Sequence, residues 1–241
     1  MNTYHPYTIF PLGDGALTIE FGDSIHESIN ARVLEFFEMM QDRKLPFVLG
    51  LVPAYASLTV FYETSMVYEL KENGQTAFSF VAEVIERFTA SYHPLVVPER
   101  EVVRIPVCYA TAFSPDLDFV ATQKGLTIDE LVQIHTSQNY RVYMLGFLPG
   151  FPYMGITDER ISITRKPVPR PEVQAGSVGL AGRQTGIYPL NSPGGWQIIG
   201  RTPFDLFDKN RAHPVLLKAG DAVEFYSITE DEYTDIKGRY S

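Results

Sequence analysis

Residues 177–200 read SVGLAGRQTGIYPLNSPGGWQIIG, and this stretch decides the fold of the second half of the chain. It contains three short β-type runs, Ser177–Ala181, Gly186–Tyr188 and Gln197–Gly200, separated by glycine and proline. Short β segments broken by turn residues at intervals of about 8–12 positions are typical of a barrel or a sandwich. Runs of the same kind continue on both sides, at Arg141–Met144, Ile161–Thr164 and Ala222–Ile228. The sequence from Tyr140 onward is therefore predicted to be mostly β.

The first 95 residues alternate strand and helix signals instead. The runs Tyr7–Phe10 and Ala16–Phe21 flank a glycine turn and predict a hairpin. A helix is predicted to begin at Ser24, because Glu27 is spaced for a capping box. Two more β-rich runs and a second amphipathic helix follow. The order ββαββα predicts two helices packed on one antiparallel sheet.

Two prolines in the segment 94–98 indicate a linker. The linker divides the chain into a predicted α+β domain, residues 1–95, and a second predicted domain, residues 96–241. The second domain is predicted to open with a strand at Val102–Tyr109. A capping box at Thr127 and Glu130 then predicts a helix that runs to about His135.

The overall composition narrows the class of protein. The chain has 241 residues, 45% hydrophobic and 20% charged, which is ordinary for a globular protein. Its net charge of −9 disfavours nucleic-acid and anionic-membrane partners, which rely on clustered Lys and Arg. Without a run of about 18 apolar residues or a basic-then-apolar leader, we expect a cytoplasmic protein with no membrane partner. The single cysteine, Cys108, is expected to be a core thiol.

The charge is unevenly distributed along the chain. Residues 146–203 carry six basic and three acidic side chains, so this segment is +3 and the remainder is −12. The same segment holds 10 of the 18 glycines and 8 of the 17 prolines. A basic, turn-rich stretch in an acidic protein is a candidate site for a small anionic ligand. The alternative is a series of β-turns with solvated arginines.

Conventional catalytic and metal-binding signatures are absent from the sequence. The glycine-rich run 176–182 lacks the Lys-Ser/Thr of a phosphate-binding loop. The five histidines have no metal-ligand spacing, so no metal site is predicted. What remains is a group of aromatic, turn-rich segments between residues 145 and 203. Their rings are suited to form apolar walls, and their arginines are suited to clamp a carboxylate or phosphate.

Five ordered motifs in this region resemble one known family. They read GFLPGFPY at 146–153, AGSVG at 175–179, QTGIYP at 184–189, SPGGW at 192–196 and GRTP at 200–203. Over essentially its whole length the chain is similar to the family of the 5-oxoprolinase B subunit, also called KipI-like or allophanate hydrolase subunit 1. One departure is the segment 108–115, CYATAFSP, where family members often carry glycines.

The resemblance implies an α+β fold class, with an N-terminal two-layer α+β domain followed by a cyclophilin-like β-barrel. It also implies a non-autonomous enzyme component that cleaves 5-oxoproline to glutamate with ATP, together with a homologous barrel partner, the C subunit, and an A subunit. Other family members supply two alternatives: an inhibitor that binds a sensor histidine kinase, and half of the carboxyltransferase unit of a urea carboxylase. Self-association is expected when the chain is alone.

Under the oxoprolinase hypothesis the polar candidates take distinct roles. Arg170, Arg183 and Arg201 would neutralise phosphate charge, which requires the three guanidinium groups to converge. Ser177, Gln184 and Thr185 would orient the substrate amide. His135 would relay a proton if its ring faces the aromatic loop, and otherwise its ring would cap the end of its own helix.

The aromatic candidates serve either hypothesis. Under the oxoprolinase hypothesis they would form the apolar walls of a substrate site, and they are Phe147, Phe151, Tyr153, Tyr188 and Trp196. Under the kinase-inhibitor alternative, the same rings without Tyr188 would form an exposed apolar docking patch. ATP is expected to bind in the assembled complex, and no metal is expected.

Overall fold

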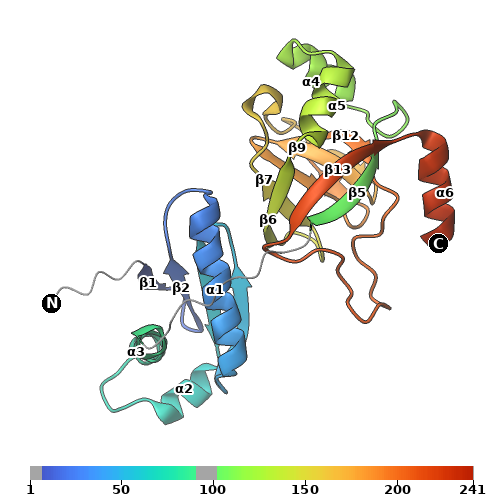
Figure 1. Cartoon of the computed structure of the whole chain (residues 1–241). Helices are drawn as coiled ribbons and strands as arrows, with labels where there is room; N and C mark the ends of the chain where they lie inside the picture. The colour runs from blue at the N-terminus through green and yellow to red at the C-terminus, as the bar shows by residue number, and fades with distance from the viewer. Residues whose placement is uncertain (1–6, 91–101, 241) are drawn as a thin grey trace. The chain divides into compact units, whose positions relative to one another are not determined.

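The structure is a computed structural model that describes residues 7–90 and 102–240 (Figure 1). The chain divides into two compact units, Met1–Pro98 and Glu99–Ser241, which are described one at a time. The domain boundary predicted between residues 95 and 96, and the linker predicted around it, lie outside the described residues.

The N-terminal unit is a four-stranded antiparallel sheet with helices packed on it. Its strand order is β1-β2-β4-β3. The fully buried side chains of β2 and β4 alternate along each strand and pair across the sheet, Leu17 with Val60 and Ile19 with Leu58. This α+β arrangement confirms the predicted fold class. The elements are β1 (Thr8–Pro11), β2 (Ala16–Glu20), α1 (Glu27–Arg43), β3 (Val48–Pro53), β4 (Ser57–Tyr62), α2 (Thr64–Leu70) and α3 (Ala77–Ala90).

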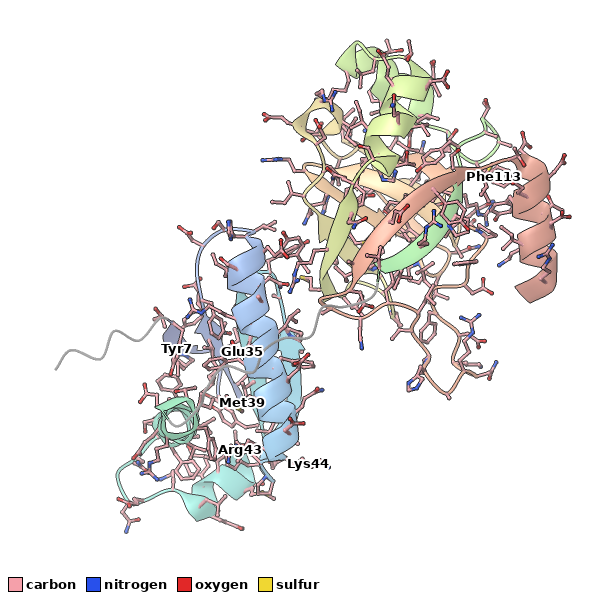
Figure 2. The ribbon with its side chains drawn as sticks, in the orientation of Figure 1. Tyr7, Glu35, Met39, Arg43, Lys44 and Phe113 are labelled. Carbon is pink, nitrogen blue, oxygen red and sulfur yellow. The ribbon has the colours of Figure 1, made fainter. Side chains whose placement is uncertain are left out.

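Helices α1 and α3 complete one apolar core with the sheet. Val33 and Met40 of α1 and Val81 and Ile85 of α3 are buried in it. Near the start of the described chain lies Tyr7, which is labelled in Figure 2. Its ring packs edge-on against Phe36 of α1, with ring centroids 5.3 Å apart. The unit therefore holds together through packing on one side of its sheet.

Two details of the N-terminal unit differ from the sequence-based predictions. Helix α2 was not predicted. The capping box expected at Ser24 and Glu27 is wrong, because α1 begins only at Glu27 and its N-cap is His26. The Nδ1 atom of His26 accepts a hydrogen bond from the backbone N–H of Ser28 at 3.3 Å.

The C-terminal unit is a closed barrel (Figure 1). Its strand order among the described residues is β10-β7-β6-β13-β5-β12-β9, and β5 and β13 pair in parallel over seven residues. Strands β8 and β11 form a separate two-stranded sheet. The barrel settles the choice between barrel and sandwich that the sequence left open. The strands are β5 (Val102–Cys108), β6 (Asn139–Leu145), β7 (Pro152–Gly155), β8 (Arg170–Val173), β9 (Ser177–Ala181), β10 (Gln184–Ile187), β11 (Ser192–Gly194), β12 (Gln197–Arg201) and β13 (Ala222–Ile228).

Three α-helices accompany the barrel in the described part of this unit: α4 (Leu117–Lys124), α5 (Ile128–Thr136) and α6 (Glu230–Tyr240). The capping box predicted for α5 is confirmed, because Thr127 and Glu130 exchange side-chain and backbone hydrogen bonds. The strand predicted at Ile161–Thr164 is wrong. The chain forms a 3₁₀ turn at Glu159–Ile161 there, and only Ile163 makes an isolated bridge, to Gly182.

Gly176 lies where the chain enters β9 and approaches the β12 side of the barrel. Its backbone N–H donates to the Tyr188 carbonyl at 2.7 Å, and its carbonyl accepts from the Thr202 N–H at 2.9 Å. Its φ is +83°, and a Cβ atom at this position would lie 2.5 Å from the Thr202 carbonyl oxygen. Both the backbone conformation and the space therefore require glycine.

Gly176→Ala is expected to destabilise the barrel strongly, and Gly182→Ala serves as its matched control. Gly182 also has a positive φ, +60°, but a Cβ atom there would meet nothing within 4 Å. The control should cost about 1 kcal/mol of unfolding free energy, and Gly176→Ala about 2 kcal/mol more because it adds a backbone clash. Denaturant unfolding followed by tryptophan fluorescence measures the difference. Equal losses in the two variants would contradict the steric argument.

Candidate ligand-binding site on the barrel

A cavity of about 250 Å³ opens on the C-terminal unit beside β10 and β12. Its walls come from the β6–β7 loop and β7, from the segment 165–169 and from the segment 188–196. All five aromatic residues predicted as apolar walls line it. The lining consists of Phe147, Phe151, Tyr153, Arg165, Pro169, Tyr188, Pro193, Gly194, Gly195 and Trp196.

Phe151 is the centre of the aromatic wall. Its ring is buried and meets Tyr188 and Trp196 edge-on, with centroids 5.1 and 5.4 Å away. Phe147 and Tyr153 pack on it at 5.8 and 4.8 Å. Edge-to-face contacts of this kind fix the orientation of each ring, so the wall is already ordered before any ligand arrives.

Two glycines make room for these rings. A Cβ atom on Gly186 would lie 3.0 Å from the Trp196 ring and 3.1 Å from the Phe151 ring. A Cβ atom on Gly194 would overlap the Tyr188 hydroxyl. The glycine of the QTGIYP motif and the first glycine of the SPGGW motif are therefore explained by the close approach of the aromatic side chains.

Arg165 supplies the charge of the cavity, although no sequence pattern singled it out. Its guanidinium carbon lies 5.7 Å from the centroid of the Trp196 ring, within cation–π range. Burial raises the pKa of Tyr153, and the positive charge of Arg165 works in the opposite direction. Arg165 is the one charged residue among those described residues that line the cavity. An exposed guanidinium over an aromatic wall is well suited to hold a carboxylate or phosphate.

Arg170, predicted as an anion-binding residue, is already paired. Its two terminal nitrogens donate to Asp116 Oδ2 at 2.7 Å and to Asp116 Oδ1 at 2.6 Å. This bidentate geometry is the one that a ligand carboxylate would use. Arg170 therefore has a structural partner in place of a ligand.

The expected convergence of the three arginines is wrong. Arg201 pairs with Ser177 at the start of β9, and its Nε donates to the Ala175 carbonyl at 2.9 Å. Arg183 lies in the exposed turn that joins the other end of β9 to β10. A five-residue strand separates the two by about 13 Å. Arg183 and Arg201 thus cannot clamp one small anion together, and their catalytic roles stay predictions.

His135 lies in the barrel core, where it is fully buried. Its ring stacks on Phe225 with centroids 4.7 Å apart. Nδ1 is 2.7 Å from the Tyr109 hydroxyl, and Nε2 is 3.0 Å from Thr185 Oγ1. Because Thr185 donates its own proton to the Gly179 carbonyl, Nε2–H is assigned as the donor to Thr185 and Nδ1 as the acceptor from Tyr109.

This position corrects both expectations for His135. Its ring neither faces the aromatic loop nor caps its helix, and burial lowers its pKa to about 3. His135 does not line the cavity, so its neutral imidazole cannot pass a proton directly to a ligand bound there. Ser177, Gln184 and Thr185 are likewise absent from the cavity lining, so the structure does not gather the predicted amide-orienting group there.

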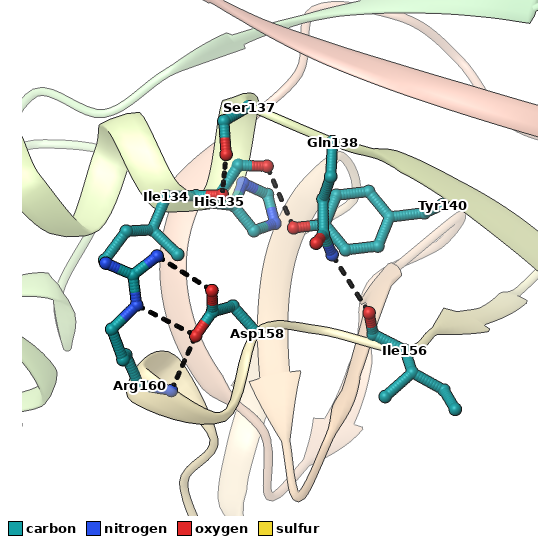
Figure 3. A network of polar contacts seen from close by, with 8 residues as sticks. All are labelled: Ile134, His135, Ser137, Gln138, Tyr140, Ile156, Asp158 and Arg160. Carbon is teal, nitrogen blue, oxygen red and sulfur yellow. Dashed lines mark hydrogen bonds and ion pairs between the residues drawn. The ribbon is translucent and has the colours of Figure 1, made fainter.

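Other basic side chains of the segment 146–203 are also engaged. Arg160 pairs with Asp158 through Nε at 3.0 Å and a terminal nitrogen at 2.8 Å (Figure 3). Figure 3 also shows the Tyr140 hydroxyl donating to the His135 carbonyl, at 2.9 Å. Lys166 binds Asp116 at 3.0 Å. Arg160, Lys166 and Arg170 therefore form ion pairs with carboxylates of the same unit. Arg165 is the cation that lines the cavity.

Residues 7–90 and 102–240 offer neither a metal centre nor a membrane span. No three His, Cys, Asp or Glu side chains in these ranges are grouped so that they could hold a metal ion. Within the same ranges, no helix has the length and apolar character needed to cross a membrane.

The buried His135 predicts a specific loss of stability in acid. Its pKa is about 3 in the fold and about 6.5 in an unfolded chain, so the unfolded state binds more protons between these pH values. The free energy of unfolding should therefore fall as the pH drops from about 6.5 to about 3, by roughly 1.4 kcal/mol per pH unit from this residue. His135→Gln should remove this contribution, although it lowers stability at neutral pH. Parallel curves for the two proteins in denaturant unfolding between pH 6.5 and 4 would contradict the assignment.

The chain matches the family model described as carboxyltransferase domain, subdomain C and D, over residues 7–217. It is 44% identical to the 5-oxoprolinase B subunit of Bacillus subtilis (strain 168) over 228 residues, which cover 94% of this chain and 95% of that protein. It is 36% identical to the 5-oxoprolinase B subunit of Escherichia coli O157:H7, with 89% of this chain and 93% of that protein covered.

The crystal structure of TTHA0988 is similar to the structure of this chain, with a TM-score of 0.75 and 34% identity over 88% of this chain. The chain spans 40% of TTHA0988, so this likeness concerns only part of that protein. The match over residues 7–217 and the near-complete alignments with two curated relatives together show that this chain belongs to the family of the 5-oxoprolinase B subunit.

Proposed function

We propose that this chain acts as the B subunit of an ATP-dependent 5-oxoprolinase, which cleaves 5-oxo-L-proline to L-glutamate together with its A and C subunits. The observation that carries the proposal is the 44% identity to a protein named as the B subunit of 5-oxoprolinase, over almost the full length of both chains. The cavity adds independent chemical support.

The cavity suits the substrate in size and in chemistry. 5-Oxoproline is a small five-membered lactam that carries one carboxylate. A cavity of about 250 Å³ lies just below the range of about 300–1,000 Å³ that is usual for larger ligands. The aromatic wall would pack against the ring, and Arg165 would pair with the carboxylate. The nucleotide would then bind elsewhere in the assembled complex, because this space is too small for both molecules.

The role of ATP follows from the chemistry of the lactam. The amide is unactivated, so water alone opens it very slowly. Transfer of the γ-phosphoryl group to the lactam oxygen releases ADP and makes the ring carbon a good electrophile. Water then adds, the C–N bond breaks to give a glutamyl phosphate, and a second water releases phosphate and glutamate. A positioned guanidinium would stabilise the negative charge that develops in these steps.

The cavity lacks groups that the reaction needs, which supports a non-autonomous role. Among the described residues that line it, none is a carboxylate or an imidazole. A general base for water attack would then come from another chain, and the A and C subunits are the proposed sources. The open side of the aromatic wall would close only on assembly, which would exclude bulk water.

Arg165→Gln is expected to abolish most of the activity of the reconstituted complex. Loss of a cation from the cavity should lower kcat/KM by about 10²–10³-fold without preventing assembly. Arg104→Gln is the matched control: Arg104 is also an exposed arginine over an aromatic ring, with its guanidinium carbon 5.0 Å from the Tyr226 centroid. Glutamate release from 5-oxo-L-proline and ATP measures both variants. A stable assembled complex of wild-type chains without turnover would overturn the proposal.

Binding to this chain alone can be followed through its single tryptophan, Trp196, which lines the cavity. Titration with 5-oxo-L-proline should change the tryptophan emission to a saturating value, and Arg165→Gln should weaken this response about tenfold or more. L-Proline, which has the carboxylate and ring but an ammonium in place of the amide, is the ligand control. An identical response to both compounds would contradict lactam recognition.

A further inference from the structure

Asp116 lies immediately before α4 and binds two other segments of the C-terminal unit, residues 166–170 and β12. Its side chain is 4% exposed. It accepts two hydrogen bonds from Arg170, one from Lys166 Nζ at 3.0 Å and one from the backbone N–H of Ile198 at 2.7 Å. Its own backbone N–H donates to the Ile198 carbonyl at 2.9 Å. One buried carboxylate therefore accepts four hydrogen bonds.

The charge of Asp116 is maintained by its partners. Burial raises the pKa of its carboxyl, but the hydrogen bonds from Arg170, Ile198 and Lys166 outweigh burial and hold the pKa below its usual value. The carboxylate is therefore ionised at neutral pH. Charge-assisted hydrogen bonds in a buried site are strong, and the loss of one partner leaves the others uncompensated.

The segments that Asp116 joins are two walls of the cavity. Lys166 directly follows Arg165, and the segment between Lys166 and Arg170 contains Pro169, which lines the cavity. Ile198 lies on β12, two positions after Trp196. The carboxylate thus fixes both the segment that carries the guanidinium and the segment that carries the aromatic ring beneath it.

Further contacts tie the same two segments to each other. The Lys166 backbone N–H donates to the Gly195 carbonyl at 2.7 Å, and Gln197 Nε2 donates to the Thr164 carbonyl at 3.2 Å. Arg170 of β8 is also the register partner of Gly194 of β11. Arg165 itself is exposed to solvent, so its place over Trp196 depends on how firmly its backbone is held.

We propose that Asp116 is a positioning residue, which holds Arg165 over Trp196 and thereby sets the geometry of the anion site. The identity of the anion as 5-oxoproline rests on the proposed function. The role of Asp116 in holding the cavity wall is independent of it. If Asp116 were only structural, its loss would lower the stability of the whole barrel. If Asp116 positions Arg165, its loss should specifically weaken the contact between Arg165 and Trp196.

The first test measures amide hydrogen exchange in the full chain. In Asp116→Asn, the amides of Lys166 and Ile198 should exchange roughly tenfold to a hundredfold faster, while β6 and β13 keep their protection. Asp205→Asn is the matched control, because it removes a carboxylate bound to a lysine, Lys237, in the same unit at 2.6 Å. Unchanged exchange at both amides, or an increase spread evenly over the barrel, would overturn the proposal.

The second test is a double-mutant cycle on Trp196 emission, with no ligand added. Arg165→Gln should shift the emission of the wild-type chain, because it removes the guanidinium from the ring. The same change should have less than about half of that effect in Asp116→Asn, where Arg165 is no longer held in place. Equal shifts in the two backgrounds would show that Asp116 does not position Arg165.

Arg170→Lys provides the same comparison if Asp116→Asn does not fold. A lysine keeps the charge but loses the bidentate geometry. The increase in amide exchange and the loss of the Arg165-dependent emission shift should therefore be smaller than in Asp116→Asn. Absence of glutamate release by the assembled wild-type complex would contradict the proposed function, while the exchange and emission experiments would still decide the role of Asp116.

Discussion

The site depends on the close packing of β9 between its two neighbouring strands. β9 pairs with β10 on one side and with β12 on the other, and Gly179 permits its close approach to β12. A Cβ atom on Gly179 would lie 3.0 Å from the Trp196 side chain. On the next strand pair, a Cβ atom on Gly200 of β12 would meet Val107 of β5 at 2.6 Å. Because interiors are close-packed, these glycines bring the strands near enough to close the barrel and to set Trp196 against Phe151.

The same packing separates residues that are close in sequence into different environments. Thr185 faces the barrel core, where it binds His135, while Tyr188 faces the cavity. Arg183 and Arg201 lie at opposite ends of β9. The site is consequently an aromatic wall with one cation. Under the proposed function, a partner chain would supply the base.

Local sequence patterns predicted the elements well and the charged partners poorly. The strands around residues 177–200, the capping box of α5 and the aromatic wall follow from alternation, capping chemistry and motif composition, all of which act over a few residues. Local patterns do not show that Arg165, and not Arg170, is the cation at the cavity. This difference depends on Asp116, which is 54 positions before Arg170 and is brought beside it only by the fold. Likewise, the burial of His135 depends on Phe225 and Thr185, which local periodicity cannot place beside it.

The proposed function depends on one binding step, in which the lactam places its carboxylate at Arg165 and its ring on the aromatic wall. The decisive measurement is a crystal structure of this chain assembled with the A and C subunits and 5-oxo-L-proline. Density for the ligand is expected against Trp196 and Phe151, with its carboxylate within hydrogen-bond distance of the Arg165 guanidinium. A ligand bound away from this cavity, with Arg165 still exposed to solvent, would rule out this binding mode.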